Sequence, residues 1–98
     1  MNRTEHLLSI VSEESHETGQ RATKAQRFSL QEIQPGQPYT NAERIMHEFA
    51  DLTGVIEMLI KEGHITNNER DFRGRVQAKK IRVEEYLKHS KECGTLQE

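Results

Sequence analysis

The short segment Pro35–Pro38, with the sequence PGQP, most constrains the fold of this chain. Proline lacks a backbone donor and glycine favours turns, so a continuous helix cannot run through this segment. On either side, apolar residues recur every three or four positions, which indicates amphipathic helices. Few stretches alternate with the period of two that is typical of strands, and tryptophan is absent. The sequence therefore predicts an all-α fold.

Three helices are expected along the chain. The first covers about residues 3–25. The second begins with the capping box TNAE at Thr40–Glu43 and ends near Lys61. The third begins with a similar pattern, TNNE at Thr66–Glu69, and ends near Lys91.

The size of the chain predicts one domain that covers residues 1–98, folded as a small bundle of three to four helices. A domain this small buries only about 60–65% of its unfolded surface. Hydrophobic residues are 33% of the chain, which is lean for a core. We therefore expect oligomerisation, as a homodimer or a homotetramer, to complete the bundle.

Composition excludes several classes of protein. Charged residues nearly balance to a net charge of -2, so a basic nucleic-acid surface is not expected. No apolar run approaches the roughly 20 residues of a membrane span. The first residues, MNRTEHLL, lack the features of a signal peptide, and a single cysteine, Cys93, excludes an internal disulfide and a thiolate zinc cage. We expect a cytoplasmic protein that binds neither membrane nor nucleic acid.

Carboxylates interrupt the apolar faces of the first two predicted helices. These faces are formed by Leu7, Val11, Thr18, Ala22 and Ala25, and by Ile45, Phe49, Leu52, Ile56 and Leu59. On a helical wheel, Glu14 lies within the first face and Glu17 at its edge. Glu48 lies within the second face and Asp51 at its edge. An antiparallel pairing of the two helices would bring all four acids together, although unpaired carboxylates are costly to bury.

Acids at these positions have three possible explanations. Internal salt bridges are one, since Arg21 follows Glu17 by four residues, but four acids would need several basic partners in the same core. A di-iron bundle uses Glu-x-x-His motifs. The chain has one, from Glu13 to His16, and His16 falls on the opposite side of the helix. A magnesium site is the third explanation, because Mg²⁺ takes hard oxygen ligands and binds phosphates. Four acids without clustered histidine or cysteine favour Mg²⁺ or Mn²⁺ over zinc.

These motifs resemble a known family. EESHE (Glu13–Glu17) followed by HEFADL (His47–Leu52) resembles the Glu-Glu-x-x-Glu … Glu-x-x-Asp signature of the all-α nucleoside triphosphate pyrophosphohydrolases. That superfamily includes MazG, dimeric dUTPases and phosphoribosyl-ATP pyrophosphohydrolase. KAQRF (Lys24–Phe28) and KKIRVEEYL (Lys79–Leu87) are similar to segments of short, phage-type MazG-like proteins. The resemblance covers roughly residues 7–90.

The resemblance implies a Mg²⁺-dependent cut between the α and β phosphates of a nucleotide, which gives a monophosphate and pyrophosphate. It implies helical dimers or tetramers from a phage or bacterial source. It also assigns the Mg²⁺ ligands and catalytic residues, which are Glu14, Glu17, Glu48 and Asp51. Glu13 matches the first acid of the motif but points outward, which leaves its role open. The long link containing PGQPY differs from the tight hairpins of some relatives. The resemblance therefore does not assign the shape of the base pocket or the identity of the substrate.

A water bound to the metal is the expected nucleophile. Whichever of the four acids does not hold the metal directly takes its proton, and Glu17 or Glu48 is the expected general base. Lys24 lies two turns after Glu17 on the same face, where it either reaches the phosphates or remains a solvated surface lysine. A non-catalytic helical interaction module, or one that senses nucleotides, is the alternative function.

The other candidate substrate-binding residues lie outside the acid motif. Lys79 lies in the apolar stripe of the third helix and either snorkels, pairs with the acids or contacts phosphate. Arg27 is expected to have one of the same roles from the loop. Asn41 is expected to start a helix, with a contact to a base or sugar as its secondary role. Phe28 and Tyr39 flank the loop. We expect them to fill the core or an oligomer interface, and stacking on a base is the alternative role.

Overall fold

The structure, a computed structural model, describes residues 1–97 and consists of α-helices and connecting loops. The helices are α1 (Arg3–Phe28), α2 (Asn41–Lys61) and α3 (Glu69–Glu92). Within residues 1–97 the only sheet-like pairing is an isolated antiparallel bridge between Ile33 and Thr40. The prediction of an all-α chain is confirmed. None of the helices in the described part is long and apolar enough to cross a membrane.

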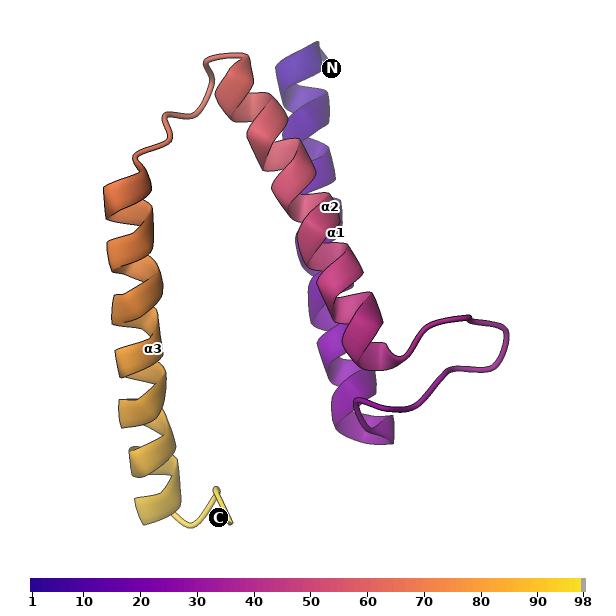
Figure 1. Cartoon of the computed structure of the whole chain (residues 1–98), viewed down its shortest axis with the longest axis vertical. Coiled ribbons are helices and arrows are strands. Elements are labelled where there is room, and N and C mark those ends of the chain that lie inside the picture. The colour runs from indigo at the N-terminus through magenta and orange to yellow at the C-terminus, as the bar shows by residue number, and fades with distance from the viewer. Residues whose placement is uncertain (98) are drawn as a thin grey trace. The chain divides into compact units, whose positions relative to one another are not determined.

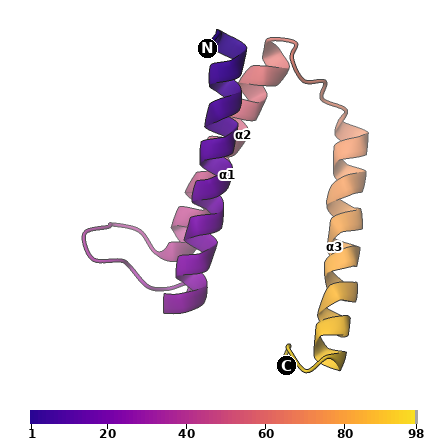
Figure 2. The same cartoon turned by 180° about the vertical axis from the view of Figure 1, so that it is seen from behind.

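The chain divides into two structural units. The first, Met1–Thr66, is an antiparallel hairpin of α1 and α2, which lie side by side along their length (Figures 1 and 2). The second unit begins at Asn67 and contains α3. The expectation of one domain over residues 1–98 stays a prediction.

Side-chain caps set the starts of the helices. Thr40 and Glu43 form the expected capping box, in which each side chain accepts a hydrogen bond from the other residue's backbone N–H. The second predicted box is not formed, because Asn68 caps α3 by accepting from the N–H of Asp71. The first helix runs three residues beyond its predicted end, to Phe28, and stops at Ser29, where φ is 85°. A serine in this left-handed region cannot continue a right-handed helix.

Replacing Thr40 with alanine is expected to lower the free energy of unfolding by about 1 kcal/mol, because the backbone N–H of Glu43 loses its acceptor. Thr53→Ala is the matched control. The Thr53 hydroxyl donates to the carbonyl of Phe49 within α2, an arrangement that gives a helix no net support. Urea denaturation of both variants checks the prediction, which equal losses would contradict.

The core of the hairpin lies toward the end away from the loop. Leu7 on α1 packs with Val55 and Leu59 on α2. Partly buried residues surround this cluster: Ile10, Val11, Leu52 and Ile56. At the same end, the Arg3 guanidinium forms a two-pronged ion pair with Glu62, with N–O distances of 2.8 and 3.0 Å.

Several residues of the predicted apolar faces are not covered. Ala22 is exposed, and so is Phe49, at 55%. α3 contains no buried residue, and its apolar residues Phe72, Val83 and Leu87 are exposed. Two paired helices bury only a narrow seam, so residues at the edge of a wide apolar arc remain in solvent. The predicted apolar faces of the first two helices are therefore wider than the seam that α1 and α2 cover.

Candidate metal centre

Three acids of the sequence motif converge between α1 and α2. One carboxylate oxygen from each of Glu14, Glu17 and Glu48 lies within 4.8 Å of the other two. Glu14 and Glu17 come from successive turns of α1, and Glu48 faces them from α2. All three residues are partly buried. The apolar seam that pairs the helices therefore also sets the register of the acids.

Asp51 lies at the margin of this cluster. It is exposed and does not belong to the group of three close oxygens. Its charge nevertheless contributes to raising the pKa of Glu14. Of the four acids expected to meet, the structure brings together three and leaves the fourth one turn away on α2.

Two carboxylate oxygens of the cluster are buried without a partner. They are Oε2 of Glu14 and Oε2 of Glu48. Arg21, the expected salt-bridge partner of Glu17, instead donates to Gln20 at 3.4 Å, and its Nη1 is itself buried without a partner. Within residues 1–97 no Lys, Arg or His nitrogen lies within 4 Å of these acids. Salt bridges therefore do not explain the buried acids, whereas a bound cation would satisfy their oxygens.

The electrostatics of the cluster raise the pKa of two of its acids, Glu14 and Glu17. Burial raises the pKa of Glu14, with added repulsion from Glu17, Asp51 and Glu13, against a lowering effect of the hydrogen bond to Glu48. Hydrogen bonding to Glu48 raises the pKa of Glu17 most, followed by repulsion from the Glu48 charge. A divalent cation would compete with these protons, so its affinity should rise with pH.

The di-iron explanation gains no second ligand from the structure. His16 is exposed, lies outside the cluster and donates through Nδ1 to the carbonyl of Ser12 at 2.7 Å. The donor set that converges is made of carboxylates alone, which fits Mg²⁺ or Mn²⁺ rather than a metal that prefers nitrogen or sulfur.

The predicted basic residues lie at different places. Lys24 is partly buried on α1, two turns from Glu17 toward the loop, and its Nζ lies 5.9 Å from the centre of the Phe28 ring. Arg27 is exposed in the last turn of α1, not in the loop, because the helix runs on to Phe28. Lys79 is exposed on α3 in the second unit, so a contact with phosphate stays a prediction.

Asn41, the predicted base or sugar contact, is completely buried. It is the first residue of α2, and its Nδ2 donates to the carbonyl of Ser29 at 3.0 Å and to Oε1 of Glu32 at 3.1 Å. Asn41 thus closes the loop, and its side chain has no exposed surface with which to contact a base or sugar. Sequence reasoning missed Glu32, because an acid inside an irregular loop carries no periodic signal.

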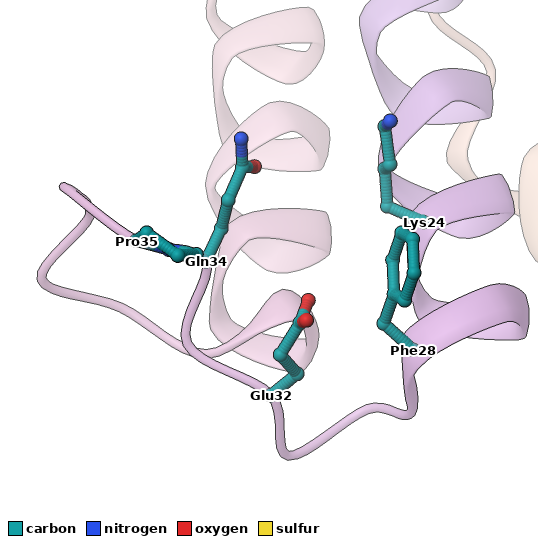
Figure 3. Close-up of a pocket in the computed structure, with 5 residues that line it drawn as sticks. All are labelled: Lys24, Phe28, Glu32, Gln34 and Pro35. Carbon is teal, nitrogen blue, oxygen red and sulfur yellow. The ribbon is translucent and has the colours of Figure 1, made fainter.

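A small open pocket adjoins this loop (Figure 3). Its volume is about 190 Å³. It is lined by Lys24, Phe28, Glu32, Gln34 and Pro35. Phe28 is half exposed beside it, and Tyr39 is also exposed, with its ring edge-on to that of His47 at 4.6 Å. Neither aromatic fills the core of the hairpin.

No protein-family model, curated protein or solved structure matches the chain at a significant level. The assignment of a function therefore depends on the motif and on the geometry described above.

Proposed function

We propose that this chain is a Mg²⁺-dependent nucleoside triphosphate pyrophosphohydrolase of the MazG-like type. It would cleave a nucleotide between its α and β phosphates and release a monophosphate and pyrophosphate. The observation that carries this proposal is the carboxylate cluster, in which two buried oxygens lack partners and no Lys, Arg or His nitrogen of residues 1–97 lies within 4 Å. The order of the acid motifs along the chain supplies the second support.

Each acid of the cluster has a role in this proposal. Glu14, Glu17 and Glu48 would hold Mg²⁺ or Mn²⁺, with Asp51 at the solvent side. When bound, such a cation stabilises charge on phosphate oxygens and lowers the pKa of water. Whichever of the acids does not hold the cation directly would accept the proton of the attacking water, and Glu17 and Glu48, which face each other from α1 and α2, are the candidates.

Basic residues near the loop balance the charge of the substrate. A nucleoside triphosphate is strongly anionic, so the acid cluster alone would repel it. Lys24 lies about 11 Å along α1 from Glu17, given the 1.5 Å rise per residue. From this position it attracts the phosphates, and Arg27 adds positive charge at the end of the helix.

The test incubates the protein with a panel of NTPs, dNTPs and modified nucleotides, with Mg²⁺ or with EDTA, and measures pyrophosphate. We expect release from at least one nucleotide and only when Mg²⁺ is present. If no member of the panel yields pyrophosphate, the enzymatic proposal is wrong. A nucleotide that binds without being cleaved would instead favour the sensing module.

The second candidate function is a helical interaction module, and the observation that favours it is the exposed apolar face of α3. The same face supports our proposal that the protein assembles as a homodimer or homotetramer. Its exposed members are Phe72, Val83, Tyr86 and Leu87. A second copy would remove these side chains from water, which is favourable in proportion to the apolar area buried. We place the assembly in the cytoplasm, where the exposed thiol of Cys93 stays reduced.

Phe72→Ser is expected to weaken this assembly by about tenfold or more, because a buried aromatic is a typical interface anchor. Ile81→Ser is the matched control. Ile81 is as exposed as Phe72, 62% against 61%, but it lies on the opposite side of α3. Sedimentation equilibrium measures both association constants. A monomeric wild type, or equal effects of the two changes, would exclude assembly through this face.

A further inference from the structure

The pocket beside the loop has the size of a single ring system. Its 190 Å³ is well below the roughly 300–1,000 Å³ of sites that enclose a drug-sized ligand. Phe28 gives it an aromatic wall, and the carboxylate of Glu32 points up between Phe28 and Gln34 (Figure 3). A half-exposed aromatic ring beside an open pocket is a ready stacking surface for a planar ligand.

Glu32 is held in place by the buried Asn41. The backbone N–H of Asn41 donates to the carbonyl of Glu32 at 2.9 Å, and Nδ2 donates to Oε1 at 3.1 Å. Both the backbone and the carboxylate of Glu32 are therefore fixed by one residue that has no exposed surface. A carboxylate has about four lone-pair sites, so this contact leaves both oxygens able to accept further hydrogen bonds.

Gln34 is oriented so that it offers a donor beside the acceptors of Glu32. Its Oε1 accepts a hydrogen bond from Nη1 of Arg44 at 2.9 Å. This contact occupies the carbonyl end of the side chain and leaves the NH₂ group as a donor. The pocket thus combines a fixed pair of acceptors, a donor and an aromatic face.

Among the common nucleobases, guanine fits this pattern best. Its N1–H and N2–H₂ groups are neighbouring donors that match the two oxygens of a carboxylate, and O6 beside them accepts. Adenine, cytosine and uracil each place a ring or carbonyl acceptor next to their donor, and that acceptor would face the Glu32 carboxylate. The mismatch leaves a polar group unpaired or repelled.

We propose that this pocket binds the guanine base of a guanine nucleotide. Phe28 stacks on the base, Glu32 accepts from N1–H and N2–H₂, and Gln34 donates to O6. Asn41 is a positioning residue for Glu32. As an account of substrate choice this rests on the proposed function, and it names (d)GTP-like nucleotides as the substrate class.

The spacing along both helices agrees with one ligand that spans the pocket and the acid cluster. Lys24 follows Glu17 by seven residues, and Glu48 follows Asn41 by seven. On either helix the cluster therefore lies two turns, about 11 Å, from the pocket end. The sugar and phosphates of a nucleotide bridge a gap of this length, with Lys24 beside their path.

Binding is tested without metal or turnover. NMR titration with GMP, IMP and AMP in EDTA gives each affinity. IMP lacks the N2 amino group, so we expect GMP to bind at least about tenfold more tightly than IMP or AMP, as hydrogen bonds to a charged group are worth about 1.5–3 kcal/mol.

Glu32→Gln should weaken GMP binding at least tenfold and remove the preference over IMP. Its amide oxygen still accepts from Asn41, so the loop should stay folded. Glu57→Gln, on the exposed side of α2, is the control.

The outcomes separate this inference from the proposed function. Absent or equal binding of the three monophosphates, or a Glu32→Gln variant that binds GMP like the wild type, overturns the pocket assignment. Cleavage of GTP, ITP and ATP at equal rates would also overturn it while leaving the hydrolase intact. Glu32-dependent GMP binding without cleavage of any nucleotide would keep the pocket and exclude the hydrolase.

Discussion

Glu48→Gln is expected to lower Mg²⁺-dependent pyrophosphate release by about 10³-fold. Glu48 is the only acid that α2 contributes to the group of three close oxygens within the described residues. Its Oε2 is also one of the two buried oxygens without a partner. Glutamine keeps the volume of the side chain but removes its charge and its capacity to accept a proton. Loss of cation-based charge stabilisation, worth several kcal/mol, corresponds to a factor of this size.

Glu57→Gln is the matched control for this variant. Glu57 lies on the same helix, is exposed and projects from the side opposite to Glu48. Glu57→Gln removes the same charge from the chain as Glu48→Gln, so a general electrostatic effect on activity would appear equally in both variants. We expect Glu57→Gln to retain the wild-type rate. Unchanged activity in Glu48→Gln, with circular dichroism showing both variants folded, would remove Glu48 from the site.

Mg²⁺ is expected to stabilise the protein at neutral pH and much less at pH 4.5. A cation at about a hundred times its Kd adds about 2.7 kcal/mol to the free energy of unfolding. For a domain of this size that raises Tm by roughly 10–20 °C. Protons compete for the same carboxylates, so the shift should shrink as Glu14 and Glu17 become protonated. Thermal unfolding with Mg²⁺ or EDTA across this pH range measures the effect.

The metal-free protein should show the opposite dependence on pH. The pKa values of Glu14 and Glu17 are raised in the folded state, so the folded protein binds these protons more tightly than the unfolded chain. The stability they contribute is fully present below their ordinary pKa of 4.5 and is lost as pH rises through the raised values. Glu43 and Glu62 have lowered pKa values, so they contribute stability that is lost below pH 4.5, outside this range.

Glu17→Gln distinguishes a repulsive metal-binding cluster from a set of salt bridges. Removing one charge relieves repulsion, so the metal-free variant should be more stable than the wild type above pH 4.5 and should lose most of its response to Mg²⁺. If Glu17 were a salt-bridge partner, the variant would be less stable, because a basic group would be left unpaired. A Tm that is independent of Mg²⁺ in the wild type would contradict the metal site.

The pairing of α1 with α2 and the meeting of three acids between them were predictable, because the periodic apolar pattern of the two helices determines both features. The capping box at Thr40 fixes the start of α2, and the apolar seam fixes how α2 faces α1. Once that pairing is set, Glu48 must meet Glu14 and Glu17. The wheel could not show that Phe49 and Asp51 lie beyond the covered seam, since that depends on how much surface two helices can bury.

The loop and α3 were harder to predict for different reasons. The pocket depends on contacts of Asn41 with Ser29 and Glu32, residues 12 and 9 positions away, and these follow from tertiary closure rather than from periodicity. The periodic apolar face of α3 predicts that something covers it. The pattern itself does not say whether that cover comes from the same chain or from a second copy.

The most direct test of the proposed activity is ³¹P NMR of a guanosine triphosphate solution incubated with the protein and Mg²⁺. We predict that the β-phosphate triplet disappears while signals of a nucleoside monophosphate and of pyrophosphate grow together. The reaction should stop when EDTA is added. Formation of a diphosphate and free phosphate would place the cut at the wrong bond. A spectrum that does not change, for GTP and for every other nucleotide of the panel, would contradict the proposed function itself.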